Sequence, residues 1–518
     1  TYSRCPCERR RAGLGDVCLL DILATLTMET LAIAAGGMAL GIFFGALPGF
    51  GGGAAMAITL PLAITMTPLN SMVFLINVYG GTHYGGGIPS VLLGVPGDAG
   101  GAPTVIDGFP MTRKGKVSEG LAFGAMGSFT GATLSVTAFL FFSPMLARFA
   151  LRFGPPEFFV RVVFGLTVLA SIDAERLWKG LLAGAFGMAI AAIGVDPYWA
   201  EERMAFGVLY LYEGLPFIPA LLGFFCISQM MMLIDEKSLV SGTVQASPTF
   251  RRIMGGMAEA FRYWRVLLQS SAVGTFIGAL PAAGATISAF VAYTLAKNTS
   301  KHPEKYGTGI PEGILATEAA NSSNVGGALI PTFALGIPGS GSTAILMGVM
   351  MFMGLRPGPR LFLEQIDLIH TLGVYLLFGC LLIGVFGALA AKYFCRMTRI
   401  PLNILIPCTI AASSLGAYSG RTEFFDIGVM LVTGVFGYLM IKFRYPLTGL
   451  ILGLVLGPMA EEYFIQSVEL AAWDFTIFFT RPICIVLWVC IAASLIGSRL
   501  LFNRKQAGAS EGADKIAL

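Results

Sequence analysis

Polar side chains interrupt one apolar stretch of this sequence, Gly313–Gly341, in a pattern that could bind a small solute or an ion. Asn321 and Asn324 are three residues apart, so a helix would place both amides on one face. Glu318 lies about one turn before Asn321, and an acid inside an apolar segment is a functional candidate by default. We therefore expect Asn321 to bind a solute or an ion and Glu318 to bind an ion. The alternatives are hydrogen bonds between helices for the amides, and a paired structural acid near the membrane surface for Glu318.

The same stretch ends in the residues LGIPGSG, which should break a helix. Proline removes a backbone donor and clashes with the preceding turn, while glycine permits positive φ. A helix that restarts after such a break presents free N–H groups that favour a carboxylate, and the freed carbonyls suit Na⁺. Ser340 and Ser342 follow the break, and they are either site residues or helix caps.

The composition indicates that these polar groups lie in a membrane protein. The chain has 518 residues, of which 55% are hydrophobic and 12% are charged, whereas a soluble domain is about 25% charged. Its apolar runs are about 20 residues long and continuous, which favours spanning helices over a β-barrel. The sequence predicts an all-α polytopic membrane protein with about eleven to fourteen membrane segments, counting broken or re-entrant helices. A net charge of +4 suggests ordinary loop charge and no nucleic-acid partner.

Two sequence blocks occur twice in the same order. The segment GIFFGALPGFG, which begins at Gly41, aligns with GTFIGALPAAG, which begins at Gly274. The segment YGGGIPSVLLGVPG, which ends at Gly97, aligns with GGALIPTFALGIPG, which ends at Gly339. Duplicated segments broken by glycine and proline at matching places are typical of a transporter binding site. We expect two pseudo-symmetric repeats, and the count of spans favours an inverted relation between them.

The duplication divides the chain. Residues 1–27 form a polar N-terminal tail, 28–234 the first transmembrane half, 235–265 a cytoplasmic linker with an amphipathic helix, 266–502 the second half and 503–518 a polar C-terminal tail.

Local breaks and loop charges refine this plan. We expect the run Ala54–Met66 to break at Pro61, and the run Leu69–Gly97 to break at its glycines. The basic loops at 113–116 and 251–265 should lie on the cytoplasmic side, because an even number of expected spans separates them. Arg148 then falls outside, against the usual charge rule, and so does Arg152.

Three segments carry a resemblance to a known family: YGGGIPSVLLGVPGDAGGAPTVIDGFPMTRKGK, EGILATEAANSSNVGGALIPTFALGIPGSGSTAILMG and GLRPGPRLF. They closely resemble the large membrane subunit of the bacterial tripartite tricarboxylate transporters, and the likeness extends from about residue 28 to 500. The resemblance implies multi-pass insertion in the inner (cytoplasmic) membrane, together with a small membrane subunit and a periplasmic solute-binding protein. It also implies secondary active uptake of a citrate-like or other carboxylate by symport with Na⁺ or H⁺, without another cofactor.

Two positions depart from that family. Its members often have Asn where this chain has Gly94, and they often read PEAANNA where this chain reads TEAANSS from Thr317 to Ser323. Both changes touch the expected site, so the preferred substrate or ion can differ from that of the citrate carriers.

The expected site combines both broken regions. The expected substrate-binding residues are Gly49, Gly51, Gly94, Pro96, Gly97, Asn321, Ser322, Asn324, Pro338, Gly339 and Ser340. The expected ion-binding residues are Asp98, Glu318, Asn321 and Ser342. Asp98 could instead cap a helix, Asp107 reads as a turn residue, and His83 reads as a packing residue. We expect no metal site and no catalytic residue.

Other functions remain as alternatives to a transporter. The protein could be a channel, or it could be a non-transporting scaffold within a multi-subunit membrane complex. An enzyme is disfavoured, because the sequence has no HExxH or GxSxG motif and no Walker-type GxxxxGK[ST] motif.

Overall fold

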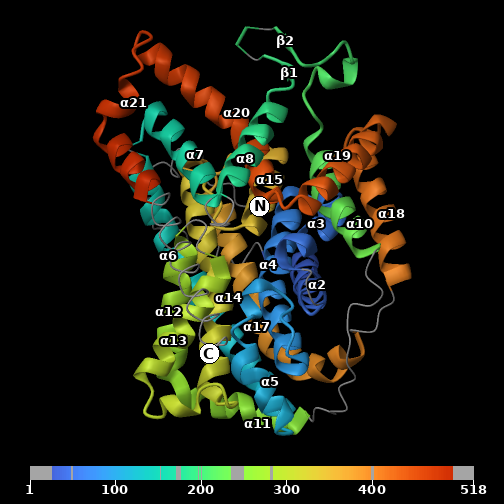
Figure 1. Ribbon diagram of the computed structural model, residues 1–518, viewed down its shortest axis with the longest axis vertical. Helices are drawn as coiled ribbons and strands as arrows, with labels where there is room; N and C mark the ends of the chain where they lie inside the picture. Colours follow the sequence, from blue (N-terminus) through green and yellow to red (C-terminus); the bar gives the residue numbers. More distant parts are fainter. Residues whose placement is uncertain are drawn as a thin grey trace, which may run out of the picture.

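The computed structural model describes residues 26–47, 51–151, 153–170, 177–196, 198–199, 201–234, 250–280, 284–397 and 402–493. These residues are almost entirely helical (Figure 1). Within them, extended structure is confined to β1 (Gly194–Val195) and β2 (Glu202–Arg203), which pair antiparallel in a loop. Among the described helices, four are long and apolar enough to cross a membrane: Met28–Gly45, Val117–Ala150, Ile366–Gly387 and Phe424–Lys442. The structure therefore agrees with an all-α membrane protein.

Two groups of helices meet at the centre. The first comprises α2 (Met28–Gly45), α3 (Gly51–Ile64), α4 (Pro68–Leu93), the 3₁₀ turn η1 (Ala99–Gly101), α5 (Val105–Arg113) and α6 (Val117–Ala150). The second comprises α12 (Trp264–Ala279), α13 (Gly284–Thr299), α14 (Pro311–Leu335), α15 (Gly341–Phe352), α16 (Pro359–Glu364) and α17 (Ile366–Met397). In each group a helical pair precedes a long helix: α2 and α3 pack on α4, and α12 and α13 pack on α14. The last helix of each group packs on the long helix of the other group: α6 packs on α14, and α17 packs on α4.

The remaining helices surround this centre. They are α7 (Pro155–Ala170), α8 (Leu177–Ala191), α9 (Phe217–Leu221), the π-helix η4 (Leu222–Ile227), α10 (Ser228–Ile234), α18 (Leu402–Arg421), α19 (Phe424–Lys442), α20 (Leu447–Leu470) and α21 (Ile477–Thr480). Helices α7, α8 and α20 pack together, and α9, η4, α10, α18 and α19 form a second peripheral group. Helix α11 (Phe250–Ala260) and the 3₁₀ turn η5 (Phe261–Tyr263) lead into α12, and α11 packs on α6 and α17. Two further short 3₁₀ turns are η3 (Leu209–Leu211) and η6 (Pro303–Lys305).

The glycines of α4 do not break it, contrary to the sequence-based expectation. Helix α4 runs unbroken from Pro68 to Leu93. Its Gly81 and Gly85 lie against the backbone of α2, so a Cβ there would overlap the carbonyls of Met38 and Ile42. These glycines let two helices approach closely, as small residues commonly do in membranes.

Helix α3 also continues through Pro61 to Ile64, so the break expected there is wrong. The residue is buried inside α3 and packs against the second peripheral group, where a Cβ on Gly416 of α18 would meet its ring and backbone. A proline in a membrane helix is tolerated when neighbouring helices and local adjustment compensate for the missing donor.

The real breaks come at glycines with a left-handed backbone. Helix α4 ends at Gly94, with φ 71°, and α14 ends at Gly336, with φ 63°. Helices α3 and α13 begin at Gly51 and Gly284, whose φ values are 62° and 69°. Only glycine adopts these angles without strain. The alignment of the two sequence blocks pairs Gly94 with Gly336 and Gly51 with Gly284.

Glycines that the alignment pairs also make equivalent contacts between helices. In α2, Gly41 and Gly45 lie against Val78 and Thr82 of α4; in α12, Gly274 and Gly278 lie against Ala320 and Asn324 of α14. Beyond its break, α4 leads toward α5 at the lower end of the molecule in Figure 1, whereas α14 leads toward α15 in the upper half.

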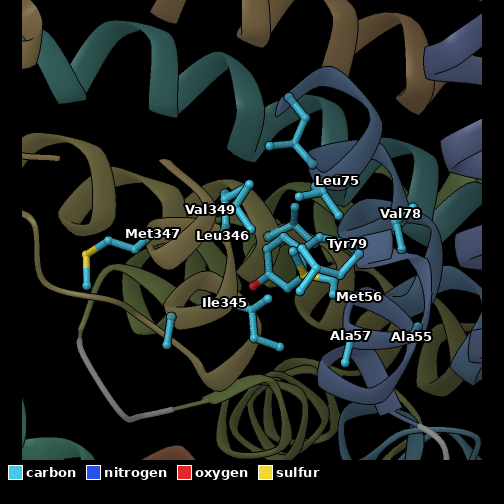
Figure 2. Packing of buried hydrophobic residues seen from close by; sticks show 14 of the residues in the cluster. Ala55, Met56, Ala57, Leu75, Val78, Tyr79, Ile345, Leu346, Met347 and Val349 are labelled. Atoms are coloured by element: carbon cyan, nitrogen blue, oxygen red, sulfur yellow. The ribbon is translucent and has the colours of Figure 1, made fainter. Parts of the chain in front are cut away.

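Helix α15 is anchored in the core of the first group. It packs on α3 and α4. Figure 2 shows Tyr79 of α4 between Ile345 and Leu346 of α15 and Met56 of α3. All four side chains are at most 1% exposed. This close packing fixes where the first turn of α15 points.

Candidate functional site

Helices α4 and α14 are joined at the centre by His83 and Asn321. The Asn321 amide donates from Nδ2 to the His83 carbonyl at 3.0 Å, and its Oδ1 lies 3.0 Å from His83 Nδ1. Asn321 is fully buried and His83 is 8% exposed. The pair therefore binds the two long helices to each other through a ring of two hydrogen bonds.

This ring determines which ring nitrogen of His83 carries a hydrogen. A carbonyl only accepts hydrogen bonds, so the amide nitrogen must face the His83 carbonyl and the amide oxygen must face Nδ1. Nδ1 must then be the donor. Its second oxygen neighbour, Oδ2 of Asp98 at 3.6 Å, is an acceptor and agrees with that assignment.

Asp98 also organises the first break. Its Oδ1 accepts a hydrogen bond from Gly101 N at 2.8 Å, so the carboxylate caps η1. A Cβ on Gly86 would overlap Asp98, and a Cβ on Gly100 would overlap Asn321. The backbone thus comes close enough to place the cap beside both His83 and Asn321.

Glu318 lies in a separate buried cluster on α14. Its Oε1 accepts from Thr104 Oγ1 at 2.6 Å and its Oε2 from Ser128 Oγ at 3.0 Å. The side chain is fully buried. Within the described residues, no salt bridge joins it to a basic side chain, and a Cβ on Gly87 would overlap its carboxylate. The acid therefore has hydroxyl partners but no paired charge there.

Thr104 lies between two oxygen atoms and has one hydrogen to donate. Thr104 Oγ1 lies within bonding distance of both Glu318 Oε1 and Thr317 Oγ1, the latter at 2.9 Å. Thr317 already faces the carbonyls of its own helix, Gly313 O and Ile314 O, to which its hydroxyl donates. A hydroxyl has one hydrogen, so Thr104 cannot donate to both neighbours. A proton on Glu318 would let the acid donate to Thr104 and Thr104 donate to Thr317.

The second break presents a capped helix start. Ser340 accepts from Thr343 N at 3.3 Å, and Thr343 Oγ1 accepts from Ser340 N at 2.9 Å. Ser340 is therefore the N-cap of α15, and its hydroxyl also lies 3.3 Å from Tyr79 OH. Ser342 is 8% exposed and lies beside Gly52 of α3, where a Cβ would also meet Thr82.

Two further polar groups of α14 are deeply buried. Among the residues that the structure describes, Ser322 Oγ and Asn324 Nδ2 have no hydrogen-bond partner, although both residues are at most 1% exposed. Buried polar atoms normally have one, so these atoms are available to a bound solute, water or ion.

The remaining expected residues flank these groups. Gly97 N donates to Gly86 O at 3.0 Å, and Gly339 N donates to Thr332 Oγ1 at 3.2 Å, so each break folds back on its own long helix. Pro96 and Pro338 precede these glycines. Gly51 begins α3, whereas Gly49 lies outside the described residues. The structure thus brings Asn321, Asp98 and Gly97 together, while Glu318 and Ser340 lie in separate clusters reached along α4.

Sequence reasoning missed three contributors to these clusters. We interpreted His83 as a packing residue, although an ionisable side chain within an apolar helix itself indicates a functional site. Thr104 and Ser128 carry no such signal, because their role depends on where α5 and α6 meet α14.

Asp107 is more than a turn residue. Its Oδ1 accepts from the backbone N–H groups of Gly307, Gly309 and Ile310 at 2.9, 2.7 and 3.1 Å. Its Oδ2 accepts from Tyr293 OH at 2.9 Å. The carboxylate therefore fastens α5 to the loop that begins α14, and so helps to hold the Thr104–Glu318 contact.

This arrangement is suited to binding a solute and an ion. Within the described ranges, no group of three or more His, Cys, Asp or Glu side chains could hold a metal ion. The ends of α4 and α14 are surrounded by amides, hydroxyl groups, two separated acids and a helix N-terminus. Such groups can bind a carboxylate and a cation at neighbouring points.

One family model and two uncharacterized relatives match this chain. The model of the tripartite tricarboxylate transporter TctA family matches residues 31–452. An uncharacterized 52.8 kDa protein in the TAR-I ttuC' 3'region of Agrobacterium vitis is 31% identical over 473 residues, which cover 89% of this chain and 92% of that protein. An uncharacterized protein in the TAR-II ttuC' 3'region of the same organism is 32% identical over 228 residues, covering 44% of this chain and 91% of that protein. No solved structure matches.

Proposed function

Because the chain belongs to the tripartite tricarboxylate transporter TctA family, we propose that it takes up a carboxylate across the bacterial inner membrane by secondary active transport. In this proposal it is the large, multi-pass permease subunit. The observation that carries it is the crossing of α4 and α14, where His83 and Asn321 join two helices that each end in a break. Broken helices that meet at a polar centre are how secondary transporters bind solutes and ions.

The substrate carboxylate binds near the second break in this proposal. Helix α15 begins there, and the positive end of its dipole favours an anion. Ser340, Ser342 and Tyr79 supply hydroxyl groups at this point, and Asn324 supplies an amide from α14. Asn321 contributes through its bonds to His83, which hold α4 and α14 together. The unpaired Asn324 Nδ2 and Ser322 Oγ support a polar ligand in the same region.

Glu318 binds the coupling ion. A buried carboxylate without a basic partner is costly unless a cation or a proton neutralises it. The hydroxyl groups of Thr104 and Ser128 could serve Na⁺ or could bond to a protonated acid. A proton on Glu318 would donate to Thr104 and leave the Thr104 hydrogen for Thr317, so this contact supports a proton as the coupling ion. Asp98, beside His83, is a second position for a cation.

The two central groups are inverted repeats. Paired glycines with positive φ support this relation, as do the equivalent contacts of α2 with α4 and of α12 with α14. The opposite directions of α4 and α14 in Figure 1 support the inversion. We propose that the repeats move together against the peripheral helices in an elevator-like motion, which carries the site across the membrane.

The transporter works with two partners, a small membrane subunit and a periplasmic solute-binding protein. This part of the proposal comes from the family, whose transporters are tripartite. The binding protein would choose the substrate and deliver it to the outer side, and membrane lipids would surround the peripheral helices.

Uptake of labelled citrate by proteoliposomes that contain all three subunits tests the proposal. An imposed proton gradient should drive accumulation, an ionophore that collapses it should stop accumulation, and a Na⁺ gradient alone should do less. Passive equilibration that is indifferent to every gradient would show a channel. The absence of any flux with all subunits present would favour a scaffold.

The elevator motion needs its own test. In a variant without the nine native cysteines, single cysteines at Val95, which is 48% exposed, and at Ser342 should change their labelling by a membrane-impermeant maleimide when citrate and the gradient are added. Unchanged labelling at both positions would contradict the elevator-like motion, whereas the proposal of transport would still depend on the uptake assay.

A further inference from the structure

A pocket with charged side chains in its lining lies outside the α4–α14 centre. It has a volume of about 190 Å³ and lies between α7, α20 and the loop that joins α15 to α16. Its lining residues include three arginines, Arg161, Arg356 and Arg360, and one acid, Glu462. The volume is large enough for several water molecules or for one small organic anion.

Arg161 is the unusual member of this pocket. It is 1% exposed, yet its Nε and Nη1 atoms have no hydrogen-bond partner within the described part of the chain. Its guanidinium lies over the ring of Phe158 at 4.4 Å, and Phe158 stacks on Tyr463 at 5.0 Å. The aromatic stack holds the guanidinium in place but satisfies none of its N–H donors. Burying a charge without hydrogen-bond partners is costly, so the pocket is suited to an anion that supplies them.

The other charges in the pocket do not provide that anion. Glu462 is the acid in the lining, and its Oε1 lies 3.8 Å from Arg356 Nη1. Arg356 is 74% exposed, so this ion pair is weak. Three guanidinium groups therefore face one carboxylate, which leaves surplus positive charge. Guanidinium binds carboxylates in a planar, two-point geometry.

The pocket adjoins the break of α14. Gly358 N, in the pocket loop, donates to Phe333 O at 3.0 Å, and a Cβ on Gly336 would lie 2.9 Å from Pro357 O. Gly165, one turn after Arg161 on α7, lies beside Ile337. In Figure 1, α7 and α20 occupy the upper half, away from α5 and α11, whose basic loops we expect in the cytoplasm. The pocket is therefore at the outer side in that orientation.

We propose that this pocket is a second anion site, in which Arg161, Arg356 and Arg360 bind a carboxylate of a small organic acid. It lies next to the break where the transported carboxylate would bind, and it opens through the exposed Arg356. That the same solute occupies both sites rests on the proposed function, whereas binding at the pocket requires no transport.

Hydrogen exchange in the purified chain tests this site with citrate as the probe. The protein is placed in nanodiscs of phosphatidylcholine, and amide exchange of the pocket loop 354–362 is followed by mass spectrometry. Citrate should slow this exchange about fivefold or more. Arg161→Met, which keeps an apolar side chain of similar length, should abolish the effect. Arg148→Gln, which changes an exposed arginine outside the pocket, should leave it intact.

Further variants keep the result interpretable. If Arg161→Met does not fold, the double variant Arg356→Gln/Arg360→Gln, altered only at exposed residues, should weaken the protection. Asn321→Ala should retain it, so failure of uptake and failure of this site are distinguishable. Protection that persists in both arginine variants would overturn the proposal. It would also be overturned if phosphatidylglycerol in the nanodiscs protects the loop fully and citrate adds nothing, because the site would then belong to a lipid headgroup.

Discussion

Asn321 and His83 bind each other through two hydrogen bonds that close a ring between α4 and α14. Helix α4 ends about three turns beyond His83, and α14 ends about four turns beyond Asn321, so the ring fixes the spacing of the two breaks. Any solute site between the breaks depends on this contact.

Asn321→Ala should therefore damage both stability and uptake. It leaves the Nδ1 hydrogen of His83 without its partner in a buried place, at a cost of about 1–3 kcal/mol. It also removes the bond that Asn321 donates to the His83 carbonyl, which keeps only its bond within α4. We expect a lower unfolding temperature and an initial rate of citrate uptake reduced about tenfold or more. Thr130→Ala is the control, because the Thr130 hydroxyl bonds to carbonyls of its own helix, Met126 O and Gly127 O. Wild-type uptake by the Asn321 variant would remove it from the site.

Glu318→Gln should separate coupling from binding. The amide keeps the size of the acid and can still bond to Thr104 and Ser128, but it neither releases a proton nor attracts Na⁺. We expect exchange of labelled for unlabelled citrate to continue, while accumulation driven by the gradient is lost. Glu304→Gln, in an exposed loop, should change neither measurement. Full accumulation by the Glu318 variant would exclude this acid as the coupling residue.

Gly87→Ala tests the close approach of α4 to Glu318. An added Cβ would overlap the carboxylate, so either the acid or the helix must move. Overpacking of this kind costs about 1–3 kcal/mol. We expect a lower unfolding temperature together with reduced uptake.

Gly53→Ala is the matched control for that substitution. Gly53 lies in α3, and a Cβ there meets nothing within 4 Å. Alanine is favoured over glycine inside a helix by about 1 kcal/mol, so this variant should be as stable as the wild type or more stable. Equal behaviour of the two glycine variants would contradict the packing argument.

Asp107 should respond differently to two substitutions. Asp107→Ala removes the acceptor for three backbone N–H groups, and hydrogen bonds to a charged group contribute about 1.5–3 kcal/mol each. Asp107→Asn keeps an oxygen for those groups, while its amide can donate to Tyr293 OH. Thermal unfolding should thus show a large loss for alanine and a small one for asparagine. Losses of equal size would mean that the charge, not the hydrogen bonds, holds the loop.

Much of the central fold could be predicted from the sequence. The aligned blocks placed the breaks after Gly94 and Gly336, because only glycine adopts the left-handed backbone without strain there. The interpretation of other glycines was wrong for a physical reason. Gly81 and Gly85 look like helix breakers in isolation, but in α4 they face the backbone of α2, where a larger residue would not fit.

The sequence by itself determined the composition of a membrane protein, the paired glycines and the polar residues of α14. Only the tertiary structure decided what those polar residues touch. Helix α5 brings Thr104 to Glu318, α4 brings His83 to Asn321, and α7 brings Arg161 to a pocket formed with α20. These partners are distant in the sequence, and a hydrogen bond depends on distance and direction rather than on residue type. Helix packing sets both, so the chemistry of the site emerges only when the helices are assembled.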